Sequence, residues 1–367
     1  MKQQKKRLLS ALLLPLCVGV LLSACADTGA EAAETAEADT KTETVPAEQQ
    51  EMTETEVPRL MNGTMQLIPD TSFSHGFLVR SQKDHANGDY TEELGQFLGN
   101  PSYGDEPHWL IAQWDSGPCL WNDRVPSDEN ILTDGVSKWV TCGQNTVTLR
   151  LNTAPYYAGK PDGAAAAGDY WPHLLLECRD FGYQSMTAEE KPYFSCDSDS
   201  LMLSFDLKLD TFSLTPNEKD WVEADQFLMY FYIHGKQSND FVWFGLQLFD
   251  SRWEKNAAYC ALDGGKADAS GSLIYSIGLS DVYRGASGNF RKDGAVSPDG
   301  EWVHIAIDLI PHLKKMFKNG NSMEYFTDAV QSLADLYIDG MNVGFETIGT
   351  VDTAVTIRNL SLTSTRK

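Results

Sequence analysis

Strict alternation of apolar and polar residues restricts the fold of this chain more than any other feature of its sequence. Between positions 201 and 210 the odd positions hold Leu, Leu, Phe, Leu and Leu, and the even ones hold Met, Ser, Asp, Lys and Asp. Successive side chains of a β-strand point to opposite faces of the sheet, so this is the pattern of a strand with one buried face. Similar runs predict further strands at 146–151, 173–178, 226–234, 241–249, 273–278, 302–309, 335–338, 343–346 and 354–362.

Helical periodicity is confined to one connection between two late strands. Pro311 begins a segment with Leu313, Met316 and Phe317 at helical spacing, and residues 321–333 repeat the pattern. Clusters of Gly, Pro, Asn and Asp separate the predicted strands. The sequence therefore predicts an all-β fold, a jelly-roll or concanavalin-like β-sandwich with one short helical excursion near residues 311–333, formed by residues 58–367 as a single domain.

The apolar residues of the last predicted strand, 354–362, change from odd to even positions partway along it. Val355 and Ile357 share one parity, whereas Leu360 and Leu362 have the other. A β-bulge near Asn359 would place all four on the core face, because a bulge inserts one extra residue into a strand.

The first 25 residues have the features of a secretory signal. Four basic residues within the first seven precede an apolar run of about 15 residues, which is shorter than the ~20 residues of a membrane-spanning helix. The run ends in Leu22-Ser23-Ala24-Cys25, which resembles the bacterial lipobox. The alternative is an ordinary signal peptide with a chance Cys.

The lipobox resemblance implies a lipoprotein whose signal peptide is residues 1–24. Cys25 would then carry the acyl chains, palmitate among them, that anchor the protein in membrane lipid, and two chains anchor stably where one does not. The expected location is the cell membrane, lipid-anchored and facing the extracytoplasmic side.

Residues 25–57 form the predicted lipidated Cys and an acidic, disordered linker. Residues 26–57 contain ten acids, one Lys and no aromatic residue. Such a segment cannot bury enough apolar surface to offset the entropy of ordering it. A short helix near residues 30–38 is the alternative.

Charge and missing motifs exclude several classes of protein. The formal net charge is −23, so phosphate backbones would repel the chain and no nucleic-acid partner is expected. HExxH, a CxxC pair, GxSxG, a Walker loop and GxGxxG are absent, and no cofactor or catalytic metal is expected. A structural calcium ion is an open hypothesis, because oxygen ligands are available from Asp263-Gly264-Gly265, Asp281 and Asp293-Gly294. Turn formation is the alternative explanation for the same residues.

Three late segments resemble the closing strands of known jelly rolls. They read EWVHIAIDL at 301–309, LYIDGMNVGFE at 336–346 and VTIRNLSL at 355–362. Residues 301–362 are thus similar to galactose-binding-like and carbohydrate-binding-module β-sandwiches. The resemblance implies a sandwich of the kind found on secreted glycan-acting proteins, and it assigns no catalytic residue.

Aromatic and carboxylate side chains suggest a ligand site on one sheet face. Sugars need flat aromatic platforms edged by polar groups, and alternation places such residues on one side of three predicted strands. If these strands are neighbours, they would form a concave, amphipathic groove suited to a polysaccharide or oligosaccharide. The alternative is a polar outer face under a long loop. The candidate ligand-binding residues are Tyr170, Trp171, His173, Glu177, Tyr230, Tyr232, Trp243 and Gln247.

Three functions compete for this face. We favour a surface-anchored lipoprotein that binds glycans for carbohydrate capture or utilisation. The second is a glycoside hydrolase or polysaccharide lyase. Hydrolysis needs two carboxylates about 5–9.5 Å apart, for which Glu177, Asp180 and Asp250 are candidates. A lyase would need a base such as Tyr232 or His173. The third is a protein-binding envelope lipoprotein.

Overall fold

A computed structural model describes residues 60–84, 89–97, 107–113, 120, 131–143, 145–157, 172–215, 223–264, 271–284, 286, 289–292 and 295–366. These residues belong to one compact unit, Glu56–Lys367. The predicted signal peptide, Cys25, the acidic linker, Tyr170 and Trp171 lie outside the described residues. No helix in the described part of the chain is long and apolar enough to cross a membrane.

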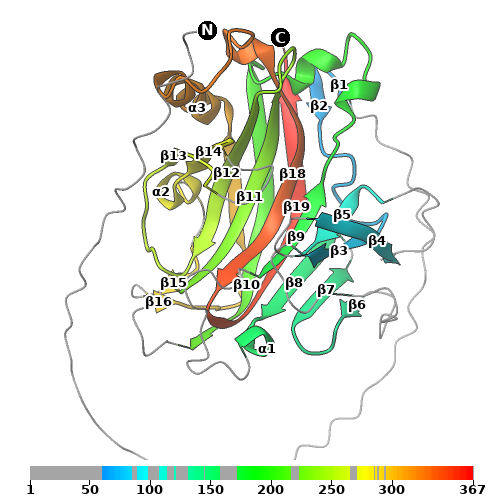
Figure 1. The fold of residues 1–367 in the computed structure, drawn as a ribbon, viewed down its shortest axis with the longest axis vertical. Helices are drawn as coiled ribbons and strands as arrows, with labels where there is room; N and C mark the ends of the chain where they lie inside the picture. Colours follow the sequence, from blue (N-terminus) through cyan, green and yellow to red (C-terminus); the bar gives the residue numbers. More distant parts are fainter. Residues whose placement is uncertain are drawn as a thin grey trace, which may run out of the picture. The chain divides into compact units, whose positions relative to one another are not determined.

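The described residues form two large β-sheets (Figure 1). In the smaller sheet the strand order is β1-β2-β19-β8-β7-β6, and β10 pairs with both β19 and β17. Its strands are β1 (Leu60–Met61), β2 (Thr64–Gln66), β6 (Ile131–Thr133), β7 (Lys138–Gly143), β8 (Thr146–Asn152), β10 (Ser200–Thr215), β17 (Val303–Asp308) and β19 (Thr350–Thr365).

The larger sheet has the order β13-β14-β12-β11-β18-β9-β5-β3-β4, and only β12–β14 and β3–β5 pair in parallel among these neighbours. Its strands are β3 (Phe77–Asp84), β4 (Asp89–Phe97), β5 (Trp109–Ala112), β9 (His173–Cys178), β11 (Ala224–Gly235), β12 (Phe241–Asp250), β13 (Tyr259–Leu262), β14 (Leu273–Ile277) and β18 (Leu336–Ile348).

Short elements complete the described part. A two-stranded ribbon joins β15 (Arg291–Lys292) and β16 (Ala295–Val296). The helices are α1 (Ala154–Tyr157), α2 (Leu279–Val282) and α3 (Ile310–Ser322), with 3₁₀ turns at Tyr183–Ser185, Lys191–Phe194 and Leu333–Asp335.

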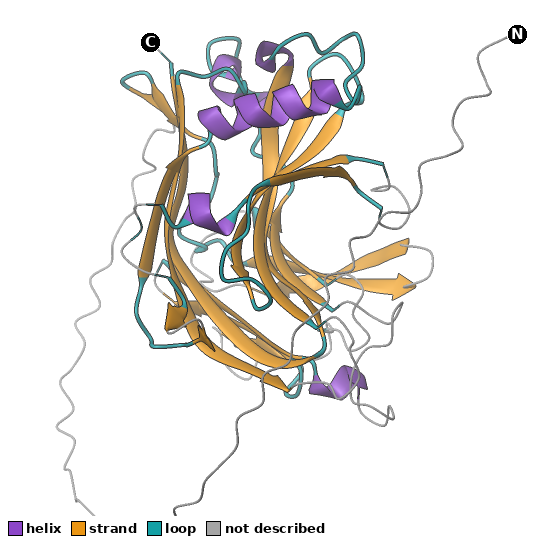
Figure 2. Ribbon diagram, turned by 90° about the vertical axis from the view of Figure 1, so that its left-hand side faces the viewer, coloured by secondary structure: helices purple, strands orange, loops and turns teal. Residues whose placement is uncertain are grey.

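The hydrophobic core lies between the two sheets. Both sheets are curved and lie one against the other (Figure 2). The odd positions of β10 from Leu201 to Leu209 are at most 1 % exposed, and Leu174, Leu176 and Cys178 of β9 are fully buried. A strand with one core face buries every second side chain, so the burial of β10 follows directly from the alternation in the sequence. In β9, Leu175 and Glu177 on the opposite face are buried as well. The predicted all-β jelly-roll sandwich is confirmed.

The bulge predicted near Asn359 is also present. The pairing of β10 with β19 shifts register between Ser204↔Ser361 and Asp206↔Arg358, and Asn359 adopts a left-handed φ of 55°. Val355, Ile357, Leu360 and Leu362 are consequently all buried. The Asp206 carboxylate holds the bulge by accepting hydrogen bonds from Asn359 Nδ2 at 2.8 Å and from Arg358 Nε at 3.0 Å.

The predicted helical excursion is correct only in its first half. Helix α3 ends at Ser322, and the pattern at 321–333 does not continue it. Glu324 has a left-handed φ of 54°, which an α-helix cannot contain. Thr327 then donates from its backbone N–H (3.2 Å) and from its hydroxyl (2.6 Å) to Asp240, so the turn between β11 and β12 binds this segment.

Two predicted strands, 335–338 and 343–346, are parts of the single strand β18. A β-bulge lies between the two parts, because the pairing with β11 shifts by one residue between Phe231↔Met341 and Ile233↔Ile338. Asp339 and Gly340 together lie opposite the single residue Tyr232, so the strand contains one extra residue, and Gly340 has a φ of 143°. The bulge therefore positions the Asp339 carboxyl.

Candidate functional site

One face of the larger sheet points away from the core and carries polar and aromatic side chains; we call it the distal face. Glu177 of β9 lies opposite Asn342 of β18, Asn342 opposite Tyr230 of β11, and Tyr230 opposite Gly245 of β12. Residues directly opposite each other in a sheet share a face. By the same pairing, the distal face holds His173, Glu177, Tyr230, Tyr232, Trp243 and Gln247.

Of the three strands that carry the predicted site, β11 and β12 are direct neighbours, whereas β9 is separated from β11 by one more strand. β18 lies between β9 and β11, and it adds Asn342, Glu346 and Tyr337 to the distal face. No local pattern in the sequence indicates this order, because β18 comes more than 100 residues after β11.

Partly exposed rings form a line across one end of the distal face; we call it the aromatic row. Tyr183 stacks on Tyr337 with ring centroids 4.0 Å apart. Further centroid distances are 5.4 Å from Tyr337 to His234, 5.2 Å from His234 to Phe241 and 4.7 Å from Phe241 to Trp243. All five residues are neither buried nor fully exposed, so ring surface is available to a ligand.

Sequence reasoning missed four members of this row, all except Trp243. Phe241 shares the parity of Trp243 within the predicted strand 241–249, so alternation could have placed it on the same face. Tyr337 lies before the bulge of β18, and Tyr183 lies in a 3₁₀ turn, where alternation carries no information. Strand pairing identifies two of them, because His234 lies opposite both Phe241 and Tyr337.

The Glu177 carboxylate is buried and engaged through both of its oxygens. Tyr232 donates its hydroxyl to Oε1 at 2.6 Å, and Arg179 Nε donates to Oε2 at 3.0 Å. Burial raises the pKa of Tyr232 well above its usual value, and the Glu177 charge raises it further. Tyr232 therefore keeps its proton, and Glu177 holds this ring beside Trp243, at a centroid distance of 5.1 Å.

The Asp250 carboxylate is also fully engaged. Arg252 donates to both oxygens, from Nε to Oδ1 at 3.0 Å and from Nη2 to Oδ2 at 2.8 Å. Gln226 Nε2 also donates to Oδ2, at 2.9 Å. Asp250 on β12 and Glu177 on β9 are three strand spacings apart in the sheet. At about 4.8 Å between neighbouring strands, their separation across the sheet is about 14 Å. That spacing exceeds the roughly 9.5 Å upper limit for a hydrolytic pair.

The third candidate carboxylate, Asp180, lies beside Asp339 at the end of β9. Asp180 accepts a hydrogen bond from the backbone N–H of Gly182. Asp339 accepts from the N–H groups of Phe181 at 3.0 Å and Tyr183 at 3.1 Å. Burial raises the pKa of Asp339, and the Asp180 charge raises it further. These bonds hold the turn that carries Tyr183 into the aromatic row.

The remaining candidate residues are largely engaged within the protein. Gln247 Oε1 accepts from Asn256 Nδ2, and His173 Nε2 lies 3.6 Å from Glu346 Oε1. The Tyr230 ring lies over Gly245, and its hydroxyl lies 3.3 Å from that of Tyr259. Whether these side chains bind a ligand stays a prediction.

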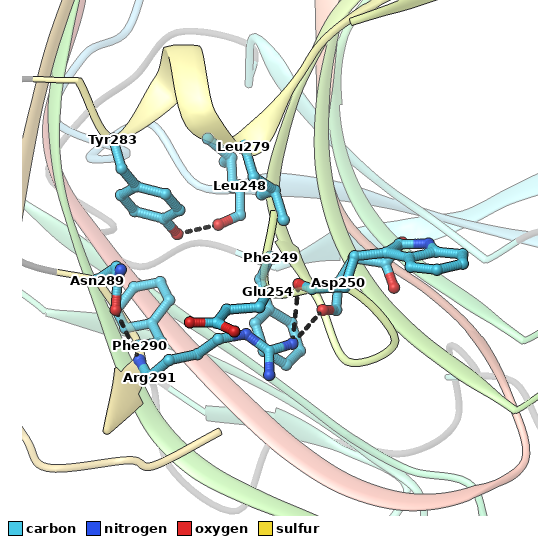
Figure 3. A pocket seen from close by; sticks show the side chains of 10 residues that line it. Leu248, Phe249, Asp250, Glu254, Leu279, Tyr283, Asn289, Phe290 and Arg291 are labelled. Carbon is cyan, nitrogen blue, oxygen red and sulfur yellow. Dashed lines mark hydrogen bonds between the residues drawn. The ribbon is translucent and has the colours of Figure 1, made fainter. Parts of the chain in front are cut away.

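A small hollow lies at the Asp250 end of β12 (Figure 3). Its volume is about 260 Å³ with its open mouth included, below the roughly 300 Å³ at which ligand pockets begin. Tyr283 donates its hydroxyl to the Leu248 carbonyl, and Arg291 Nη2 donates to the carbonyls of Asp250 (2.8 Å), Ser251 (3.1 Å) and Trp253 (2.9 Å). The hollow is thus braced by internal bonds and does not coincide with the aromatic row.

The described residues contain no group of three or more His, Cys, Asp or Glu side chains that could hold a metal ion. Of the suggested calcium ligands, Asp263 and Asp281 are described, whereas Gly265, Asp293 and Gly294 lie outside. Cys142, Cys196 and Cys260 are free thiols.

No protein-family model and no curated protein sequence matches the chain. It is similar in structure to the family 11 xylanase from Neocallimastix patriciarum, with 15 % identity, a TM-score of 0.34, and coverage of 64 % of this chain and 90 % of that one. It is also similar to the family 12 xyloglucanase from Bacillus licheniformis, with 10 % identity, a TM-score of 0.34, and coverage of 65 % of this chain and 98 % of that one. A third similar structure is the xyloglucanase domain of NopAA from Sinorhizobium fredii in complex with cellobiose, with 10 % identity, a TM-score of 0.31, and coverage of 64 % of this chain and 90 % of that one. Likeness at this level assigns no residue a role.

Proposed function

We propose that this protein binds a glycan on the distal face of its larger sheet, with the aromatic row as the contact surface. The supporting observation is the line of partly exposed rings from Tyr183 to Trp243, which crosses neighbouring strands. Sugars present apolar C–H faces that pack on aromatic rings and hydroxyls that pair with polar groups. The exposed side chains of Asp180 and Arg179 supply such groups beside the row.

The state of the carboxylates favours binding over hydrolysis. Glu177 and Asp250 have both oxygens engaged by neighbouring donors, and they lie too far apart to act together on one bond. A lyase is favoured less for a related reason, because the Tyr232 hydroxyl already donates to Glu177. Glycan binding without turnover is therefore the function that these contacts support best.

We further propose that the protein is a lipoprotein anchored through Cys25 and facing the extracytoplasmic side. Leu22-Ser23-Ala24-Cys25 after a basic and apolar leader supports this proposal. Cys25→Ser removes the thiol that accepts the acyl chains, so the protein should leave the membrane fraction. Fractionation and mass spectrometry of the mature N-terminus measure this. Cys260→Ser is the matched control and should stay in the membrane fraction. A Cys25→Ser protein that also stays there would overturn the lipid anchor.

Replacement of Trp243 tests the glycan site. After a glycan array has identified a ligand, Trp243→Ala should weaken its binding at least fivefold, corresponding to about 1 kcal/mol for a lost aromatic contact. Titration calorimetry measures the affinity, and urea unfolding should show little loss of stability. Trp302→Ala is the matched control, because Trp302 lies on the smaller sheet, where its ring packs against Arg358 at 3.9 Å.

Three other outcomes would redirect the proposal. A loss of about 3–5 kcal/mol in stability for Trp243→Ala would mark this residue as core. Turnover of the ligand that Glu177→Gln abolishes while binding persists would identify a hydrolase or lyase. Failure to retain any glycan at millimolar concentration would leave a protein partner as the better hypothesis.

A further inference from the structure

Helix α3 exposes a cluster of lysines in an otherwise acidic protein. Its sequence, IPHLKKMFKNGNS, contains no acidic residue, and Lys314, Lys315 and Lys318 are all exposed. At 100° per residue the three side chains fall within an arc of about 100°. The opposite side of the helix is buried through Leu313, Met316 and Gly320. The lysines therefore share the outward face.

Exposed apolar side chains adjoin this helix. Met323, directly after α3, is 40 % exposed, and Leu262 of the edge strand β13 is 51 % exposed. Cys260 Sγ lies 3.8 Å from Met323 Sδ, so β13 and the end of α3 are in contact. Helix α3 also lies beside β13 and β14 (Figure 1). Met323 lies about 80° around the helix from Lys315, toward β13, and the exposed Glu324 follows it. The lysine face and these apolar side chains therefore adjoin at the β13 side of the helix, and we call Lys314, Lys315, Lys318, Met323 and Leu262 the α3 patch.

We propose that the α3 patch rests on an anionic lipid bilayer. Each Lys close to such a surface raises binding about fivefold, and exposed apolar side chains enter the boundary between headgroups and acyl chains. The rest of the chain is repelled, because the whole chain has a net charge of −23 even with these three lysines included. At physiological ionic strength the Debye length is about 8 Å, so only charges near the bilayer decide which face approaches it. This inference does not depend on glycan binding.

Lysine footprinting of the full chain on vesicles tests this orientation. The vesicles contain phosphatidylglycerol and phosphatidylcholine in one sample and phosphatidylcholine alone in the other, and acetylation of each Lys is read by mass spectrometry. On anionic vesicles the labelling of Lys314, Lys315 and Lys318 should fall at least about threefold. It should recover in 1 M NaCl, where the Debye length is about 3 Å. Lys255 and Lys292, which are exposed elsewhere, should label equally in both samples.

Charge-reversal variants make the test specific. In Lys314→Glu/Lys318→Glu the protection of the remaining Lys315 should disappear, whereas the matched control Lys255→Glu/Lys292→Glu should keep it. Equal labelling on both kinds of vesicle would overturn the proposal, as would protection on phosphatidylcholine alone. Equal protection by soluble dextran sulfate would indicate an anionic polymer as the partner and would also overturn it.

Discussion

At pH 7 the Asp225→Asn variant should be more stable than the unchanged chain by up to about 4 kcal/mol, whereas near pH 4 the two should unfold at similar free energies. Asp225 lies on the core side of β11 and is fully buried, and among the groups that act on its pKa only the Thr353 hydroxyl favours the charged form. Burial raises the pKa of Asp225 to about 7, the charge of Asp250 adds to this, and the Thr353 hydroxyl opposes it.

The direction of this effect follows from where the proton is held. The folded chain keeps the Asp225 proton up to about pH 7, whereas the unfolded chain releases it near its ordinary value of 3.8. A carboxyl with a raised folded-state pKa contributes stability below the unfolded value, and that stability is lost as the pH rises toward the folded value. Three pKa units at 1.36 kcal/mol each correspond to about 4 kcal/mol.

The measurement is urea unfolding of both proteins at several pH values between 4 and 7.5. The difference in unfolding free energy isolates Asp225, because the other carboxyls are common to both proteins. Asp328→Asn, at an exposed carboxyl, is the matched control and should not produce this pH-dependent gain. A difference between Asp225→Asn and the unchanged chain that stays constant from pH 4 to 7.5 would refute a buried neutral Asp225.

Gly245→Ala should destabilise the protein by about 1–3 kcal/mol, because the added methyl group has no room. A Cβ at Gly245 would overlap the Tyr230 ring and would lie 2.7 Å from the Met229 carbonyl oxygen. The ring cannot stay on the distal face in its present position. Thermal or urea unfolding measures the loss of stability.

Gly264→Ala is the matched control, because a Cβ there meets nothing within 4 Å. Its effect on stability should stay within about 0.5 kcal/mol. In a Tyr230→Ala background, Gly245→Ala should cost clearly less, since contacting residues are not additive. Equal costs in both backgrounds would mean that Tyr230 does not rest on Gly245.

The local pattern of residues was sufficient for the class of fold and for the faces of its strands. Alternation placed Leu174 and Leu176 in the core and Glu177 on the other side, and the phase change at Asn359 located a bulge. These features were predictable because side-chain direction in a strand depends only on parity and because one face must be buried. The helical pattern at 321–333 was misleading, because tertiary contacts such as the hydrogen bonds from Thr327 to Asp240 determine the conformation of that segment.

Only the tertiary structure decided which side chains meet. The position of β18 between β9 and β11 places Tyr337 beside His234, and the bulge at Asp339 aims its carboxyl at the turn that carries Tyr183. The same folding engages Glu177 with Tyr232 and isolates Asp225 between the sheets. Strand order and burial of single polar groups depend on contacts between residues far apart in the chain, and periodicity within a segment contains no information about them.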